Sequence, residues 1–246
     1  MTLSLYLTDA YLREFEGTVS KLADHGVVLD ESTFYPGGGG QPCDSGTLVG
    51  PGGESWTVSG AEKSESGVIH WISEEPLPSP GDRLRGSIHW ERRYQHMRYH
   101  TALHILSGVV FHRFGSGITG GQIYSDRARM DFSLPDFSRG LADSLIEAMN
   151  QVVQRAIPIH VRFISREEAT HDPSLIRVAV DLMPEVSEVR LVDIEGFDVQ
   201  ADGGTHVRST REVGEVRLEK IENKGARNKR LTLTLGPSPR DLDDPS

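Results

Sequence analysis

Cysteine is almost absent from this sequence, which has a single one, Cys43, among its 246 residues. One thiol excludes an intrachain disulfide framework and any cysteine-rich zinc module. No run of about 18 apolar residues occurs, which excludes a transmembrane helix. The first residues carry neither a basic region nor a long apolar segment, so no signal peptide is expected. These absences predict a cytoplasmic protein that does not associate with a membrane.

Positive charge is also scarce, because 26 basic residues stand against 36 acidic ones and the net charge is −10. Bulk attraction to phosphates needs positive charge, so this composition excludes a generic binder of polyanions. Basic residues do gather locally, in two groups: Arg83, Arg85, Arg92, Arg93 and Arg98, and Lys220, Lys224, Arg227, Lys229 and Arg230. Such patches are compatible with a specific contact to a nucleic acid.

The length exceeds the usual domain size of about 100–150 residues, which predicts one large domain or two modest ones. A hydrophobic content of 37% excludes a wholly disordered chain. Short strand-like runs separated by Gly, Pro, Asp and Ser fill the first part of the chain, at 27–29, 33–35, 47–49, 56–58, 68–72 and 83–88. This spacing indicates a small barrel or sandwich. Segment 75–82 holds three prolines and is expected to be a turn or linker.

The pattern changes from Glu91 onward. Apolar residues follow helical spacing from Arg93 to Phe114 and again from Leu141 to Val153, the second stretch being stopped by Pro158. Strands are expected at 129–132, 160–164, 189–192 and 231–235. We therefore predict an α+β chain with a β-barrel-like domain at 1–90 and a two-layer α/β domain at 91–236. Residues 237–246, rich in Pro, Asp and Ser, are expected to be a disordered tail.

Two histidines four residues apart, His100 and His104, form the strongest local motif. On a helix they share one face, which suits two imidazoles on one metal ion. A surface pair or two core histidines are the alternatives. No Glu follows His100, so the zinc-protease pattern is absent. His96, one turn earlier, is either a further ligand or a solvated neighbour.

A second motif, Asp202-Gly-Gly-Thr-His206, places a carboxylate and an imidazole around two glycines. Glycines allow backbone angles that are closed to other residues, so this loop can wrap both side chains around one centre. Carboxylate and imidazole are ordinary zinc ligands. A Gly-Gly turn with an exposed histidine is the interpretation favoured for this segment by itself. With the first motif, it offers three histidines and one carboxylate for four-fold coordination.

Three further segments carry glycines or positive charge. Residues 33–42 contain four consecutive glycines without the Lys-Ser/Thr ending of a P-loop, so the segment is either a linker or bare backbone beside a substrate, within reach of Thr33 or Gln41. Thr119 and Gln122 flank Gly120-Gly121, where a hairpin turn is favoured over a ligand site. The basic stretch 223–230 is expected to be a turn before a strand and is the best candidate for a phosphate contact.

Together these segments resemble the alanyl-tRNA editing proteins, the free-standing AlaX family related to the editing domain of alanyl-tRNA synthetase. The matching pieces keep their order along the chain: the Gly-rich motif at 33–42, His-x-x-x-His at 100–104, residues 129–132, Gly-Gly-Thr-His at 203–206, and residues 223–225. Each is weak alone, and the ordered combination is specific. With an N-terminal Gly-rich domain before the zinc domain, this chain resembles the longer members of the family.

The resemblance implies a zinc site and an editing domain. The family's ligands, carried over, fall on His100, His104, Asp202 and His206, although the family's usual pattern has Cys where this sequence has Asp202. Carboxylate is a harder ligand than thiolate, so metal affinity is expected to fall or metal preference to shift. The alternative is that Asp202 does not bind the metal and that water takes the fourth place. From their positions beside the glycine motifs, Thr33, Thr119 and Gln122 are candidate contacts of the substrate's serine hydroxyl, and the backbone at Gly203 and Gly204 is a candidate contact of the ester. The candidate tRNA contacts are the basic residues Arg92, Arg93, Lys224, Arg227, Lys229 and Arg230.

The resemblance also implies an activity, the hydrolysis of tRNA(Ala) mischarged with serine or glycine, by a metal-dependent aminoacyl-tRNA deacylase acting in trans. Zinc either activates the attacking water or holds the substrate in place. No catalytic acid or base is assigned. Two alternatives stay open, a deacylase of another aminoacyl-tRNA such as mischarged tRNA(Thr), and a non-catalytic binder of aminoacyl-tRNA with a structural metal.

Overall fold

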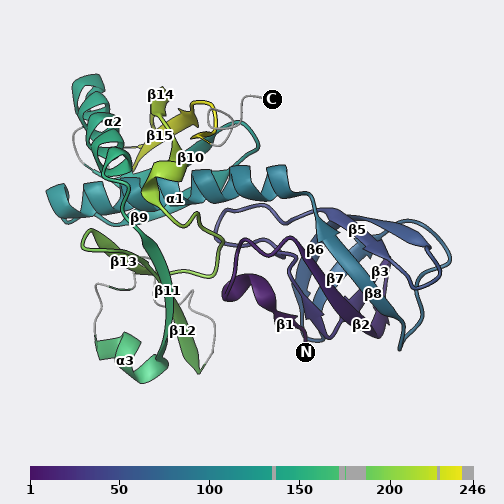
Figure 1. The fold of residues 1–246 in the computed structure, drawn as a ribbon. Helices are drawn as coiled ribbons and strands as arrows, with labels where there is room; N and C mark the ends of the chain where they lie inside the picture. Colours follow the sequence, from purple (N-terminus) through teal and green to yellow (C-terminus); the bar gives the residue numbers. More distant parts are fainter. Residues whose placement is uncertain (135–136, 172–174, 176–186, 226–227, 240–246) are drawn as a thin grey trace. The chain divides into compact units, whose positions relative to one another are not determined.

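The computed structural model describes residues 1–134, 137–171, 175, 187–225 and 228–239. The chain divides into two compact units, Met1–His96 and Met97–Ser246. The division lies inside helix α1 (Trp90–Phe114), six residues after the predicted boundary at residue 90. Residues 240–246 of the predicted tail lie outside the described residues. The architecture is mixed α/β with a closed barrel in the first unit (Figure 1).

Six strands close the barrel of the first unit. They are β2 (Glu14–Ala23), β3 (Gly26–Leu29), β7 (Gly67–Ile72), β6 (Ser55–Ser64), β5 (Gly46–Val49) and β8 (Arg83–Ile88), in the order in which they pair. Every neighbouring pair is antiparallel, which agrees with the predicted short strands and turns. A short parallel pair, β1 (Leu3–Ser4) with β4 (Glu31–Ser32), and the 3-10 helix η1 (Leu5–Leu7) complete the unit.

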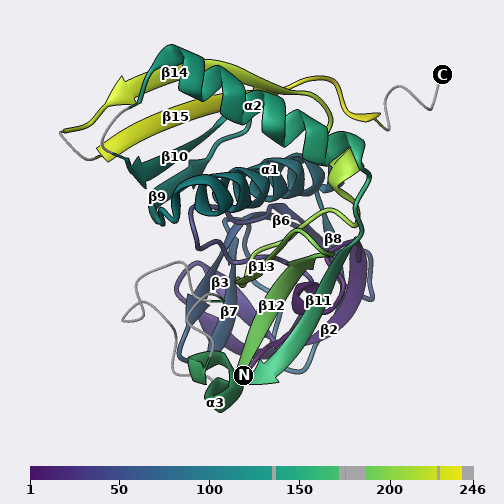
Figure 2. The same cartoon turned by 90° about the vertical axis from the view of Figure 1, so that its left-hand side faces the viewer.

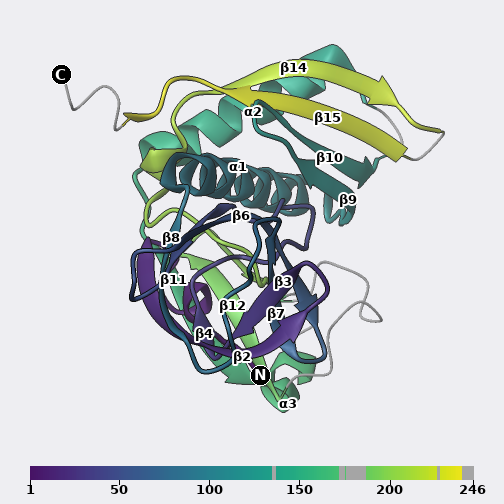
Figure 3. The ribbon, with the colours of Figure 1, turned by 90° about the vertical axis from the view of Figure 1, so that its right-hand side faces the viewer.

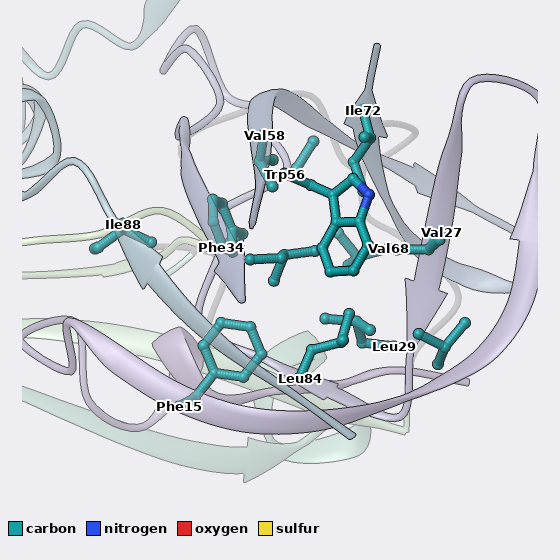
Figure 4. Close-up of a cluster of buried hydrophobic side chains, with 13 residues drawn as sticks. Phe15, Val27, Leu29, Phe34, Trp56, Val58, Val68, Ile72, Leu84 and Ile88 are labelled. Atoms are coloured by element: carbon teal, nitrogen blue, oxygen red, sulfur yellow. The ribbon is translucent and has the colours of Figure 1, made fainter. Parts of the chain in front are cut away.

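Apolar side chains from every barrel strand meet in one core (Figure 4). Alternation along β7 and β8 buries every second residue, because successive side chains of a strand point to opposite faces. Phe15 and Phe34 pack edge to face there, with ring centroids 6.0 Å apart. The imidazole of His70 is also inside, where burial lowers its pKa to about 4. Its ring lies 2.7 Å from the hydroxyl of Ser32, which keeps a neutral histidine satisfied.

Residues 33–35, predicted as a strand, are a loop in the structure, so that prediction is wrong. The backbone amides of this loop donate hydrogen bonds to side chains and not to a neighbouring strand. The amide of Phe34 donates to the Ser32 hydroxyl at 3.1 Å and that of Tyr35 to the Asp44 carboxylate at 2.7 Å. Strand β2 is ten residues long and has alternating burial. The sequence does not predict it, because charged and small residues interrupt its apolar positions.

The four glycines at 37–40 form an ordered loop and not a linker, since the φ angles are 83°, 129°, 56° and 81°. Such positive values are strained for side-chain-bearing residues, so this loop needs glycine. Gly38 and Gln41 exchange backbone hydrogen bonds of 3.1 and 2.9 Å. The hydroxyl of Tyr35 donates to the Gly38 carbonyl at 2.9 Å, which ties the loop back to its own start.

The described residues of the second unit form two sheets. One has the order β14 (Val216–Asn223), β15 (Asn228–Leu235), β10 (Ala128–Ser133) and β9 (Ile118–Ile123). The other has the order β11 (Ile159–Ser165), β12 (Glu188–Ile194) and β13 (Asp198–Ala201). In Figure 3 the strands of the first sheet face the viewer. The expected strands at 129–132, 160–164, 189–192 and 231–235 are all present.

Glycines 120 and 121 lie inside strand β9, so the favoured hairpin turn at this point is wrong. The turn falls four residues later, where the amide of Tyr124 donates to the Arg127 carbonyl at 2.8 Å. A side chain at Gly121 would stand 3.9 Å from Leu103 of α1, in ordinary contact. Gly121 therefore lies where strand β9 packs beside that helix.

Both predicted helices are present, α1 and α2 (Arg139–Gln154). Helix α1 ends at Gly115, whose φ of 61° and bond to the Phe111 carbonyl form a left-handed cap. Helix α2 begins at Ser138, whose hydroxyl accepts from the Leu141 amide at 3.1 Å. The α2 stretch stops four residues before Pro158, and helix α3 (Arg166–His171) and the 3-10 helix η4 (Thr210–Val213) are further elements. No helix among the described residues has the length and hydropathy needed to cross a membrane.

Helix α2 lies along the four-stranded sheet (Figure 2), and its Asn150 side chain forms hydrogen bonds with strand β14. The amide of Asn150 donates to the carbonyl of Val216 at 2.9 Å and accepts from the amide of the same residue at 2.8 Å. This pairing satisfies both backbone groups at the start of an edge strand.

A buried ion pair stabilises the first unit. The Arg93 guanidinium, which has no exposed surface, donates from its Nε to the Asp44 carboxylate at 2.9 and 3.1 Å and pairs with it again through Nη2. It also donates to the carbonyls of Ala10 at 2.9 Å and Thr33 at 2.6 Å. Because no phosphate can reach a fully buried side chain, we infer a structural role for Arg93.

We expect Arg93→Gln to lower the free energy of unfolding of the barrel by about 3–5 kcal/mol, because it leaves the Asp44 carboxylate buried without its counter-charge. The matched control is Arg92→Gln, an exposed neighbour on the same helix turn, with an expected change within about 0.5 kcal/mol. All three tryptophans, Trp56, Trp71 and Trp90, lie in the first unit, so urea unfolding followed by tryptophan fluorescence reports on it. Equal stability of the two variants contradicts the structural role.

Candidate metal centre

Four ligand-type side chains of the second unit converge on one point. His100 and His104 project from one face of α1 on successive turns, with ring centroids 5.1 Å apart. Asp202 and His206 belong to the loop that follows strand β13. The structure thus brings together all four residues predicted as metal ligands, although about a hundred residues separate the two pairs in the sequence.

The distances among the four side chains suit a single metal ion. Their ligand atoms all lie within 4.8 Å of one another. The Nε2 atoms of His100 and His104 are 3.6 and 4.0 Å from Oδ1 of Asp202, and Nε2 of His206 is 3.1 Å from Oδ2. Tetrahedral coordination with bonds of about 2.0–2.2 Å requires ligand separations of roughly 3.4 Å. The donor set therefore fits one divalent ion.

The carboxylate of Asp202 is held from two sides. Its Oδ2 accepts from the Gly204 amide at 2.6 Å. Its own backbone is tied to strand β12, because the Asp202 amide donates to the Arg190 carbonyl at 3.1 Å and Nη1 of Arg190 donates to the Asp202 carbonyl at 2.8 Å. Oδ1 is thereby turned toward the two histidines of α1.

The imidazole of His206 is oriented by Thr101, which follows His100 on α1. The Thr101 hydroxyl oxygen lies 3.1 Å from Nδ1 of His206 and accepts from the Val207 amide at 3.3 Å. A proton on Nδ1 directed at Thr101 leaves the lone pair of Nε2 for a metal. Neither Thr101 nor Arg190 was predicted, because a threonine beside a histidine and an arginine in a strand carry no sequence pattern of their own.

Opposite charges and burial set the protonation of the centre. Burial by itself raises the pKa of the Asp202 carboxyl, but the surrounding imidazoles of His100, His206 and His104 hold it well below its usual range. Burial lowers the pKa of His206, against the opposing hydrogen bond to Asp202. A carboxylate that stays ionised beside a neutral imidazole is the state that metal binding requires.

The two glycines of the loop differ in their surroundings. A Cβ atom at Gly204 would overlap the imidazole of His100, whereas one at Gly203 would have no atom within 4 Å. Gly204 therefore permits the close approach of the loop to His100, and its amide is used by Asp202. Gly203 faces open space beside the cluster.

His96 stays outside the four-residue cluster. Its side chain is 1% exposed, and its Nδ1 has no hydrogen-bond partner within the part of the chain that the structure describes. Burial, followed by the positive charges of Arg92 and Arg93, lowers its pKa to about 4. It is a neutral buried histidine and not the solvated neighbour that the sequence allowed.

The predicted substrate contacts outside the loop occupy different settings. Thr33, in the first unit, is fully buried and donates its hydroxyl to the Leu12 carbonyl at 2.8 Å. Thr119 and Gln122 lie on strand β9 of the second unit. The exposed hydroxyl of Thr119 donates to Asn228 at 3.0 Å, and the half-buried amide of Gln122 donates to the Ile123 carbonyl at 3.3 Å. Substrate contact by these three residues stays a prediction.

The predicted tRNA contacts near residue 227 are largely paired within the protein. Lys224 is exposed and lies 3.3 Å from Glu222. Lys229 is buried and donates to the Gly225 carbonyl at 3.1 Å. The Arg230 guanidinium donates two bonds, of 2.7 and 2.8 Å, to Asp131, and it holds the pKa of that carboxyl below its usual value.

Two predicted tRNA contacts remain. Arg227 lies outside the described residues. Arg92 is exposed, and its guanidinium makes only long bonds, of 3.3 and 3.4 Å, to the Cys43 carbonyl. Contact of Arg92 with tRNA stays a prediction.

Comparison with known proteins gives a consistent result. The model for the threonyl and alanyl tRNA synthetase second additional domain matches residues 189–232, and that for class II (A) tRNA synthetases matches residues 7–92. The alanyl-tRNA editing protein AlaX-M of Saccharolobus solfataricus is 40% identical over 96% of this chain and 100% of its own length. The AlaX-M protein of Methanosarcina acetivorans is 42% identical over 96% and 99%. The alanine–tRNA ligase of Pyrococcus furiosus is 34% identical over 90% of this chain and 24% of the ligase.

The fold and the cluster define a protein with a barrel unit and a second unit that carries a buried centre of three imidazoles and one carboxylate. Because the similarity to the AlaX-M proteins covers both chains almost from end to end, this chain belongs to the alanyl-tRNA editing protein family. The family resemblance carried by the sequence motifs is thereby confirmed.

We expect Gly204→Ala to weaken metal binding by roughly 10–100-fold, because the added methyl group displaces His100 and removes the alignment of the donor set. Gly203→Ala is the matched control, with space for the methyl group and no change expected. Metal affinity is measured by competition with a chromophoric chelator. Equal affinity of the two variants contradicts the role assigned to Gly204.

Proposed function

We propose that this protein is a hydrolase that deacylates tRNA(Ala) mischarged with serine, and also with glycine, acting in trans. The observation that supports this most directly is the convergence of His100, His104, Asp202 and His206 in a chain whose relatives are named alanyl-tRNA editing proteins. Serine and glycine differ from alanine by few atoms, which is the kind of error that a synthetase site cannot reject by binding alone.

We propose Zn²⁺ as the ion that this centre holds. Imidazole nitrogens and a carboxylate oxygen are ordinary zinc ligands, and no thiolate is among the four residues. When bound, such an ion supplies Lewis-acid polarisation of the ester or its attacking water, or a fixed anchor for the substrate. The carboxylate of Asp202 makes this donor set harder than the family's usual one, which favours a broader tolerance of divalent metals.

The chain's own residues position the substrate beside this centre. Strand β9 packs next to the part of α1 that carries His104, through Gly121 and Leu103. Thr119 and Gln122 on this strand offer hydroxyl and amide groups for the serine side chain. A site that satisfies a substrate hydroxyl disfavours alanine, which leaves the site's polar group unpaired. The open space at Gly203 admits the ester.

The activity is tested by the hydrolysis of Ser-tRNA(Ala) beside Ala-tRNA(Ala), with the wild type and with His104→Ala. We expect rapid loss of serine and sparing of alanine by the wild type, and a loss of activity on the order of 100-fold or more in the variant, because the donor set is incomplete. Asp202→Cys is the matched variant that keeps a fourth ligand, and we expect it to retain bound metal.

Several outcomes contradict this proposal. Unchanged deacylation by His104→Ala excludes a metal-dependent reaction at this centre. Faster hydrolysis of mischarged tRNA(Thr) than of Ser-tRNA(Ala) assigns the protein to another aminoacyl-tRNA. Binding of aminoacyl-tRNA without turnover identifies a non-catalytic binder.

A further inference from the structure

A hollow of about 240 Å³ lies on the second unit, and none of the four metal-binding residues lines it. We call it the α1–α2 hollow. Its lining comes from the C-terminal part of α1, from α2 and from the turn between β12 and β13: Val109, His112, Arg113, Ala148, Gln151, Val152, Arg155 and Phe197. None of the predicted site residues lines it, so the proposed reaction leaves it unexplained.

The hollow concentrates positive charge on an acidic protein. Among the described residues, eight line the hollow, and they include two arginines and no carboxylate, although the net charge of the chain is −10. Arg113 is exposed and, within the same described part, donates to neutral acceptors, the carbonyl and hydroxyl of Ser144 at 3.4 and 3.3 Å. Arg155 is exposed, and its guanidinium has no partner within the described part of the chain. Both charges are therefore available to an anion.

A role of these arginines in helix stability is the alternative explanation. Arg113 lies in the last turn of α1 and Arg155 is the C-cap of α2, where positive charge interacts favourably with the helix dipole. That interaction accounts for about 0.3–1 kcal/mol at each exposed end. It requires no common cavity, whereas here two arginines from different helices line the same hollow together with Gln151.

Aromatic rings form part of the same wall. The rings of His112 and Phe197 lie edge to face, with centroids 5.3 Å apart. Phe197 is seated against Gly108, where a side-chain Cβ would come within 2.8 Å of its ring. Aromatic rings beside arginines are the combination by which proteins bind single-stranded nucleic acid, through stacked bases and paired phosphates.

The hollow also lies at a useful distance from the metal centre along α1. His112 follows His104 by eight residues, which corresponds to about 12 Å along the helix axis and a rotation of roughly 80°. At about 3.4 Å per stacked nucleotide, this separation spans roughly three or four nucleotides. The acceptor end of a tRNA is a single strand of about this length.

We propose that the α1–α2 hollow binds phosphates of the single-stranded acceptor end of tRNA, with Arg113 and Arg155 as the phosphate ligands. This inference rests on the proposed function, because it assumes that the aminoacylated end lies at the metal centre. It places the tRNA footprint on the C-terminal ends of α1 and α2, in addition to the tRNA contacts predicted in the basic stretch 223–230.

The test compares the wild type with the double variant Arg113→Gln/Arg155→Gln. The matched control is Arg139→Gln/Arg217→Gln, which removes two exposed charges of the same unit that are paired with Asp143 and Glu215. Binding of uncharged tRNA(Ala) is measured by fluorescence anisotropy over a range of KCl concentrations. The KM and kcat for Ser-tRNA(Ala), the thermal stability and the metal content are measured for the same three proteins.

We expect the double variant to lose two phosphate contacts. The slope of log K against log salt concentration then decreases in magnitude by about 1.4, since each contact with a single strand contributes about 0.7. Raising the salt concentration from 0.15 M to 1 M therefore lowers the tRNA affinity of the wild type about tenfold more than that of the double variant. KM rises by a similar factor with kcat and metal content unchanged, and the control variant matches the wild type.

The outcomes separate this inference from the proposed function. An unchanged salt slope and KM in the double variant overturn the hollow as a tRNA site, whether or not its thermal stability falls. A wild type that does not deacylate Ser-tRNA(Ala), but binds tRNA through the two arginines, contradicts the proposed reaction and supports the hollow. An equal loss of tRNA affinity in the control variant shows that the effect comes from the total charge of the protein, which overturns the specific site.

Discussion

The attraction between one largely buried carboxylate and three imidazoles is the constraint on which the centre of the second unit depends. The Asp202 side chain is 15% exposed, and a carboxylate so far removed from water is costly unless charges or hydrogen bonds compensate it. The imidazoles of His100, His104 and His206 face it, and the Gly204 amide binds its second oxygen. The divalent cation that we propose for these four donors compensates the negative charge more completely than neutral imidazoles do.

The rest of the second unit holds this arrangement in place. Helix α1 presents two ligands one turn apart, and Thr101 on the same helix orients the third. Strand β12 anchors the loop of Asp202 through Arg190. Since the contacts of Thr101 and Arg190 join α1 and β12 to the loop after β13, a small displacement of that loop moves Asp202 and His206 together relative to the two ligands of α1.

Much of this could be predicted from local patterns. The spacing of His100 and His104 requires only the period of a helix, and the Gly-Gly pair beside Asp202 and His206 indicates a tight loop. Five of the six barrel strands follow from short apolar runs and turn residues, whereas the sequence does not predict β2. Gly120 and Gly121 were misassigned because two glycines favour a turn locally, whereas the structure needs them inside a strand packed beside α1. Arg93 resembled a surface cation because its partner, Asp44, is 49 residues away. The α1–α2 hollow likewise has no sequence pattern, since three separate elements build it.

The central claim is that the cluster holds one metal ion through nitrogen and oxygen donors only. X-ray absorption spectroscopy of the purified protein, together with its metal content, tests it most directly. The account predicts one divalent ion per chain with three histidine nitrogens and one carboxylate oxygen at about 2.0–2.2 Å and no sulfur neighbour. A stoichiometry near zero after growth with zinc, or a sulfur neighbour at about 2.3 Å from Cys43, would contradict it.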